Sequence, residues 1–191
     1  MLSSTSQAMA TRLDRRIAAS ELDRLPHEWD TRYELVGGVL YMSRRPPLGH
    51  QRIATRLLLS LGPPVLARDG EVLVEPGVVW DDDGDDNVAP HLAVVLSDKP
   101  PDTGKLRTCP EIVVEIVSPG ADNRRRDYEA KRALYYDRGA HEYWIVDPEE
   151  RSVHVLTRSE SGWNESTLRD DDRLTSALVP GWAGIIVRDL L

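Results

Sequence analysis

The pattern of hydrophobic and polar positions is densest near the middle of the chain. Residues 112–117 read I-V-V-E-I-V, an apolar and β-branched run typical of a strand that is buried on both faces. Glu115 interrupts this run, although a buried carboxylate without a partner costs several kcal/mol. A turn at residues 118–120 and a helix over about residues 124–138 follow, and this helix carries Lys131. We therefore expect the chemistry of the protein to lie where this strand and this helix meet.

The segments before and after this strand predict a hairpin, a helix and several strands. Two apolar runs, residues 33–36 and 39–42, flank Gly37-Gly38, a pair typical of a tight hairpin turn because both central residues take positive φ. Residues 50–61 have an apolar stripe at helical spacing, and the following Gly62-Pro63-Pro64 predicts the end of that helix. Apolar runs predict further strands at residues 72–80, 88–96, 142–148 and 152–156.

This order of elements predicts an α/β (α+β) domain in which helices flank a mixed β-sheet and a β-hairpin comes first. Residues 1–19 are rich in Ser and Thr and predict a flexible tail. Residues 20–191 predict a single domain, because a chain of this length suits one hydrophobic core. The region after residue 162 looks irregular except for a short apolar edge piece, and the acidic residues 81–87 predict an exposed turn.

Composition excludes several classes of protein. The net charge of -8 argues against a protein that coats nucleic acid by bulk electrostatics. No apolar run is long enough to span a membrane, and the single cysteine, Cys109, excludes a disulfide framework and fits a reducing cytoplasm. The sequence contains no phosphate-binding glycine loop, no G-x-S-x-G turn, and no pair of histidines at the spacing of zinc proteases. A set of acids and one lysine remains as the candidate chemistry.

Four residues around Glu115 are candidates for that set. Asp127 and Tyr135 lie four residues before and after Lys131, so all three share one face of the predicted helix. An ordinary surface ion pair between Asp127 and Lys131 is the alternative interpretation. Glu34 lies on the first strand of the hairpin, where the alternative is a surface acid on an alternating strand.

The chain resembles the Uma-two family of restriction-endonuclease-like proteins, part of the PD-(D/E)xK nuclease superfamily. The resemblance rests on Y-E-L-V-G-G-V-L, on His50-Gln51, on E-I-V-V-E-I-V-S-P, and on D-Y-E-A-K-R-A-L-Y-Y-D-R-G-A-H-E-Y-W-I-V-D-P. It implies a restriction-endonuclease-like fold and metal-dependent hydrolysis of DNA with Mg²⁺ or Mn²⁺. Glu115 would be the strand acid, Glu34 a further acid near the metal, and Lys131 the replacement for a strand lysine, because Val117 stands at that position.

The remaining assignments follow this resemblance. His50, Arg124 and Arg125 are expected to contact the substrate, while Asp127 and Tyr135 would support the site. A homodimer is expected by analogy with nucleases that cut both strands.

One residue departs from the family pattern. The family has aspartate in its V-x-P-D motif, whereas this chain reads Val88-Ala89-Pro90-His91. We expect Glu115 and His91 to be the metal ligands, and a histidine nitrogen suits Mn or Zn better than Mg. The alternatives are a catalytically inactive member that binds nucleic acid or protein, and a metal hydrolase that acts on another phosphoester.

Overall fold

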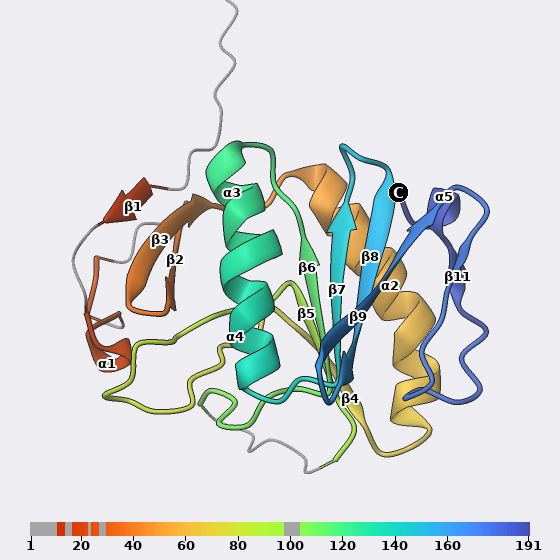
Figure 1. Ribbon diagram of the computed structural model, residues 1–191, viewed down its shortest axis with the longest axis horizontal. Helices are drawn as coiled ribbons and strands as arrows, with labels where there is room; N and C mark the ends of the chain where they lie inside the picture. Colours follow the sequence, from red (N-terminus) through yellow and green to blue (C-terminus); the bar gives the residue numbers. More distant parts are fainter. Residues whose placement is uncertain (1–10, 14–16, 23, 27–29, 98–103) are drawn as a thin grey trace, which may run out of the picture.

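A six-stranded mixed β-sheet forms the centre of the computed structural model, which describes residues 11–13, 17–22, 24–26, 30–97 and 104–191 (Figure 1). Only β6 and β7 run parallel, and the other neighbouring strands are antiparallel. The prediction of a mixed sheet is therefore confirmed. In spatial order the strands are β4 (Glu71–Val74), β5 (Leu92–Val95), β6 (Ile112–Ile116), β7 (Glu142–Asp147), β8 (Ser152–Ser159) and β9 (Gly162–Arg169).

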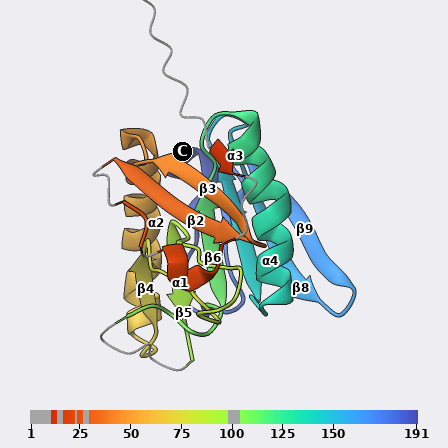
Figure 2. The same cartoon turned by 90° about the vertical axis from the view of Figure 1, so that its left-hand side faces the viewer.

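Helices cover both faces of this sheet (Figures 1 and 2). On one face lies α2 (Leu48–Leu66), and on the other lies a continuous helix made of α3 (Ala121–Arg125), the π-helical segment η1 (Arg126–Ala130) and α4 (Lys131–Asp137). Alternate residues of β6 divide between the two cores. Ile112, Val114 and Ile116 pack with α2, whereas Val113 and Val117 pack with α4. Glu115 shares the second face and therefore points toward the helix that carries Lys131.

A second, three-stranded sheet carries the predicted hairpin. Its strand order is β1 (Thr11–Leu13), β3 (Val39–Arg44) and β2 (Thr31–Val36), and it lies beside a short helix, α1 (Ala19–Leu22). Gly37 and Gly38 have φ angles of 56° and 75°, which confirms the predicted turn. Within the predicted tail, residues 11–13 pair with β3 and α1 begins at Ala19, while residues 1–10 and 14–16 lie outside the described residues. The division into a flexible tail and a single domain stays a prediction.

The long helix and the end of the chain differ from the sequence prediction. Helix α2 does not end at Gly62 but continues through Pro63 and Pro64, because the next turn places Val65 in the core with no exposed surface. Burial of that side chain offsets the hydrogen bonds that proline cannot donate. Strand β9 escaped prediction because most of its residues are exposed, so it lacks the apolar alternation of a half-buried strand. A two-stranded sheet of β10 (Arg173–Leu174) and β11 (Ile185–Ile186), and helix α5 (Val187–Leu190), complete the fold.

The acidic segment before β5, residues 81–87, is not fully exposed as predicted. Asp86 and Asn87 are buried rather than exposed. Asn87 forms an isolated bridge with Leu35 of β2, and Asp86 accepts a hydrogen bond of 2.7 Å from the backbone of Gly37. Arg138 donates to the other carboxylate oxygen of Asp86 over 2.6 Å. The second half of this turn therefore attaches the hairpin to the main domain.

Candidate active site

Strand register brings His91 and Glu115 together. Strands β5 and β6 are antiparallel with Leu92 opposite Val114, so the preceding residue, His91, lies opposite Glu115. The Nδ1 atom of His91 lies 2.6 Å from Oε2 of Glu115, and the backbone nitrogen of Ile116 lies 3.2 Å from the same Nδ1. Because Glu115 is fully buried, its charge requires partners of this kind.

Lys131 joins two carboxylates from distant parts of the chain. Its Nζ atom donates to Oε1 of Glu34 and to Oε1 of Glu115, at 2.7 Å in each case. The hydroxyl of Tyr135 lies 3.3 Å from the same oxygen of Glu115, and the backbone of Ala89 donates to Glu34 over 2.9 Å. The four residues Glu34, Glu115, Lys131 and Tyr135 form what we call the acid–lysine cluster. Lys131 is only 1% exposed, so its role is not that of a surface ion pair.

A basic residue absent from the sequence prediction lies against this cluster. Arg126 is 3% exposed, and its Nη1 atom is 3.9 Å from Oε2 of Glu34. Its Nε and Nη2 atoms donate to the two carboxylate oxygens of Asp127 over 2.8 and 3.2 Å. The alternative pairing of Asp127 with Lys131 is therefore wrong, since Asp127 binds Arg126. Arg126 and Lys131 are five residues apart, a spacing that an α-helical pattern places on different faces.

The electrostatics favour charged forms of the cluster. Burial alone would raise the pKa of Glu34, but the Lys131 ammonium and then the Arg126 guanidinium outweigh this effect and lower that pKa to about 2. The pKa of Glu115 is lowered in the same way, by Lys131 and by the hydrogen bond with His91, against the effect of burial. Burial and the charge of Glu115 raise the pKa of Tyr135 well above its ordinary value. The site therefore contains two ionised carboxylates and a neutral phenol at neutral pH.

His50, at the start of α2, reaches the edge of this site. Its ring centroid lies 5.6 Å from that of His91 in an edge-to-face arrangement. Burial and the neighbouring His91 lower the pKa of His50 to about 4, so this imidazole is neutral at neutral pH. Its Nδ1 atom is buried and has no hydrogen-bond partner among the described residues. His50 lines a pocket of about 340 Å³ together with Arg52, Arg56 and Val117.

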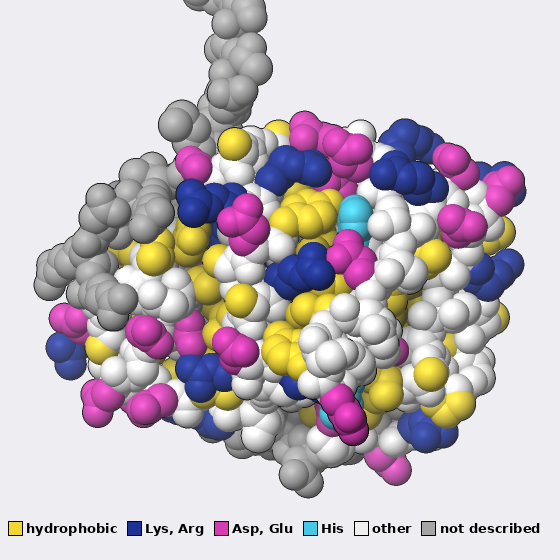
Figure 3. Space-filling model, in the orientation of Figure 1, with side chains coloured by type: hydrophobic (Ala, Val, Ile, Leu, Met, Phe, Trp, Pro, Cys, Tyr) yellow, Lys and Arg dark blue, Asp and Glu magenta, His cyan; other side chains and the backbone are white. Residues whose placement is uncertain are grey.

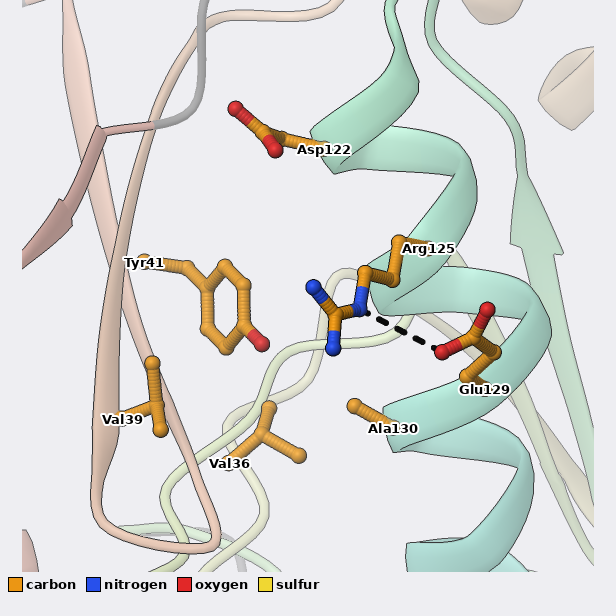
Figure 4. Close-up of a pocket in the computed structure, with 7 residues that line it drawn as sticks. All are labelled: Val36, Val39, Tyr41, Asp122, Arg125, Glu129 and Ala130. Atoms are coloured by element: carbon orange, nitrogen blue, oxygen red, sulfur yellow. Dashed lines mark hydrogen bonds and ion pairs between the residues drawn. The ribbon is translucent and has the colours of Figure 1, made fainter.

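Arg124 and Arg125, the predicted substrate contacts, point away from the acid–lysine cluster. Arg124 binds the buried Asp147 over 2.5 Å and stacks on Tyr128. Arg125 forms an ion pair with Glu129 over 3.3 Å and faces the ring of Tyr41 across a pocket of about 310 Å³ between the hairpin and α3 (Figure 4). Contact of these two arginines with a substrate stays a prediction. On the face that α3 and α4 cover, basic and acidic side chains are interspersed (Figure 3).

The donor set allows a test of the expected metal. Among the described residues, no group of three or more His, Cys, Asp or Glu side chains is arranged to bind a metal ion. Mg²⁺ sites in nucleases use one or two carboxylates and complete the shell with waters and substrate phosphates, so a small donor set suffices. Here the adjacent donors are the Glu115 carboxylate and the His91 imidazole, with the Glu34 carboxylate beyond Lys131. This mixture of oxygen and nitrogen fits Mn²⁺ better than Mg²⁺.

Comparison with known families shows which family the chain belongs to. The profile of the Uma2 family, described as "Putative restriction endonuclease", matches residues 19–188. The chain belongs to the Uma2 family. The match includes every residue of the acid–lysine cluster, as well as His91 and Arg126. A comparison with curated proteins finds no match.

A solved structure supports the fold. The crystal structure of a putative nuclease belonging to DUF820 from Anabaena variabilis is 18% identical to this chain, covers 91% of it and 97% of its own length, and superposes with a TM-score of 0.73. The restriction-endonuclease-like fold of this Uma2 protein is therefore confirmed. None of the helices in the described part of the chain has the length and apolarity that a membrane span needs.

Proposed function

We propose that this Uma2 protein is a metal-dependent endonuclease that hydrolyses phosphodiester bonds in DNA. The observation that carries the proposal is the position of Lys131, whose Nζ atom lies 2.7 Å from the Glu34 carboxylate of β2 and 2.7 Å from the Glu115 carboxylate of β6. A buried ammonium that contacts two acids beside an imidazole supports this proposal, because the acids and the imidazole could hold a divalent ion while the ammonium stabilises charge on a phosphate. The proposed cellular location is the cytoplasm.

Each residue of the cluster has a role in this proposal. Glu115 and His91 would bind the ion, with the Glu34 carboxylate as a further oxygen donor. An ion held by these residues would supply a water of lowered pKa and would neutralise charge on the phosphate. The Lys131 ammonium stabilises the negative charge that develops on the phosphate oxygens, and Glu34 orients that ammonium. The Tyr135 hydroxyl orients the Glu115 carboxylate.

Nicking of supercoiled plasmid DNA tests the proposal. The wild-type protein should nick in Mn²⁺ and more slowly in Mg²⁺, because of the imidazole nitrogen in the donor set. Glu115→Gln should lower the rate at least 100-fold, on the order of the loss when an electrostatic group of an active site is removed. Glu129→Gln is the matched control, since Glu129 lies at the surface of the helix that carries Lys131, with its side chain 70% exposed. Equal nicking by wild type and Glu115→Gln would contradict the proposal.

A non-catalytic role is the second candidate. It is favoured by His91 in place of the family aspartate and by the fact that both oxygens of Glu115 already accept contacts, from Lys131 and His91. Titration calorimetry separates the two candidates. Binding of Mn²⁺ by the wild type that is lost in Glu115→Gln counts against the non-catalytic role, whereas no binding of either ion supports it.

A further inference from the structure

The π-helical segment changes which side chains of the helix face the acids. In η1 the backbone nitrogen of Lys131 donates to the carbonyl of Arg126, so the hydrogen bond joins residues five apart instead of four. This turn therefore places Arg126 and Lys131 one above the other on the same side of the helix. Both side chains reach Glu34, Lys131 at 2.7 Å and Arg126 at 3.9 Å. A regular α-helix would turn one of them away.

Only some of the hydrogen-bond donors of the Arg126 guanidinium have a partner. Asp127 accepts from Nε and Nη2, so it fixes the plane of the group. Nη1 has no hydrogen-bond partner among the described residues, and its distance to Glu34 is too long for one. A buried donor on a charged group is normally satisfied, because leaving it without a partner costs about 1–3 kcal/mol or more. The unpaired Nη1 atom can therefore donate a hydrogen bond to an anionic oxygen.

The charges around Arg126 are consistent with such a ligand. Glu34, Glu115 and Asp127 carry three negative charges, and Lys131 and Arg126 carry two positive charges. One divalent cation and one phosphodiester group would bring this set to neutrality. Arginine suits this task because its planar fork matches phosphate oxygens.

We propose that Arg126 is a second phosphate-binding cation of the site, whose Nη1 atom donates to an oxygen of the phosphodiester group that lies against Lys131. This assignment rests on the proposed endonuclease function and extends it, because the substrate phosphate is then bound from two positions on one helix. Asp127 acts as a positioning residue that orients the guanidinium.

Fluorescence anisotropy with a short labelled DNA duplex in Ca²⁺ tests the assignment by binding alone. Arg126→Gln should weaken binding roughly tenfold, the loss expected for one hydrogen bond to a charged group. The slope of log affinity against log salt should fall by about 0.9, which corresponds to one phosphate contact. Arg126→Lys should restore most of the slope, because it keeps the charge.

Arg132→Gln is the matched control. Arg132 is adjacent to Lys131 but forms a surface ion pair with Glu165 over 2.9 Å, so its removal should change the affinity less than twofold, the effect that is usual for an exposed charge. If Arg126→Gln unfolds, the double variant Arg126→Gln/Asp127→Asn replaces the ion pair with a neutral amide pair and is measured instead. Unchanged affinity and slope in the Arg126 variants, or equal losses in Arg132→Gln, would overturn the assignment.

The plasmid assay on the wild type separates the two proposals. Wild-type nicking together with an Arg126→Gln variant that binds and nicks like the wild type would refute the role of Arg126 and leave the endonuclease function intact. A wild type that neither binds the duplex nor nicks the plasmid would refute both.

Discussion

Lys131 allows two buried acids to remain ionised side by side. Glu34 and Glu115 both direct Oε1 at its Nζ atom, and both carboxylates are almost fully buried. Without the ammonium, two like charges at this range would raise each other's pKa, and burial would act in the same direction. Lys131 is therefore the largest of the influences that keep both acids ionised, and Arg126 and His91 act in the same direction.

Lys131→Met should reverse the effect of acid on stability. In the wild type, the pKa of Glu34 is lowered from 4.5 to about 2, so the stability that this acid contributes is present above pH 4.5 and is lost as the pH falls toward 2. In the variant the folded-state pKa values rise above their unfolded values, so stability should increase as the pH falls from neutral to about 5. Urea unfolding in EDTA at a series of pH values measures both trends.

The same experiment gives the size of the effect. At neutral pH the variant should be about 3–5 kcal/mol less stable, because removal of one partner leaves buried charges uncompensated. Arg132→Met, which removes a surface cation one residue away, should cost less than about 1 kcal/mol. A variant that loses stability on acidification as the wild type does would contradict this account of the cluster.

The sequence predicted some residues of the site and not others. Glu115 was predicted from physical grounds, because an acid within an apolar run must have a buried partner. Lys131 and Glu34 were candidates from their own elements, but only the resemblance to a family joined them in one site, since 97 residues separate them and no local pattern links them. The position of Arg126 beside the site was missed because the extra residue in the π turn shifts the helical register. No sequence pattern indicates that shift.

At the scale of elements, the hairpin matters because it delivers Glu34 from outside the central sheet. Its attachment depends on the segment around residue 86, where the Asp86 carboxylate bonds to the backbone of Gly37 and to Arg138. The sequence predicted the hairpin from its two glycines but predicted an exposed acidic turn in place of this attachment. A charged residue can be buried only where it has partners. The partners of Asp86 come from other elements, so the local sequence does not predict its burial.

Asp86→Ala should loosen the hairpin and lower activity together. Two hydrogen bonds are lost and the Gly37 nitrogen and Arg138 are left without an acceptor, so the free energy of unfolding should fall by about 1–3 kcal/mol. Plasmid nicking should fall as well, because Glu34 orients Lys131 from this hairpin. Asp85→Ala is the control, since Asp85 is exposed and uses only its backbone carbonyl, which accepts from Gly38. Equal effects of the two substitutions would argue against this attachment.

At the scale of the whole molecule, one apolar stripe stands out on α2. Leu48, Leu59 and Leu66 are 72%, 71% and 64% exposed, and they lie whole numbers of helical turns apart. Val74 on the edge strand β4 is 52% exposed. The proposed homodimer stays a prediction, and this stripe is where we expect it to form.

Light scattering after size exclusion tests the homodimer. The wild type should elute with twice the mass of the chain, and Leu59→Lys should shift it to the monomer while thermal unfolding shows an intact fold. Arg68→Glu, in the turn after α2, serves as the exposed control. A wild type that is monomeric at all concentrations would contradict the prediction.

The distance along the chain between Glu34 and Lys131 has a consequence for folding. Their contact closes a loop of 97 residues, and contacts this distant in sequence form late because the chain entropy is lost before the contact stabilises anything. A nascent or partly unfolded chain therefore lacks the assembled cluster. The proposed nuclease activity should therefore appear only after the last, slowest phase of refolding.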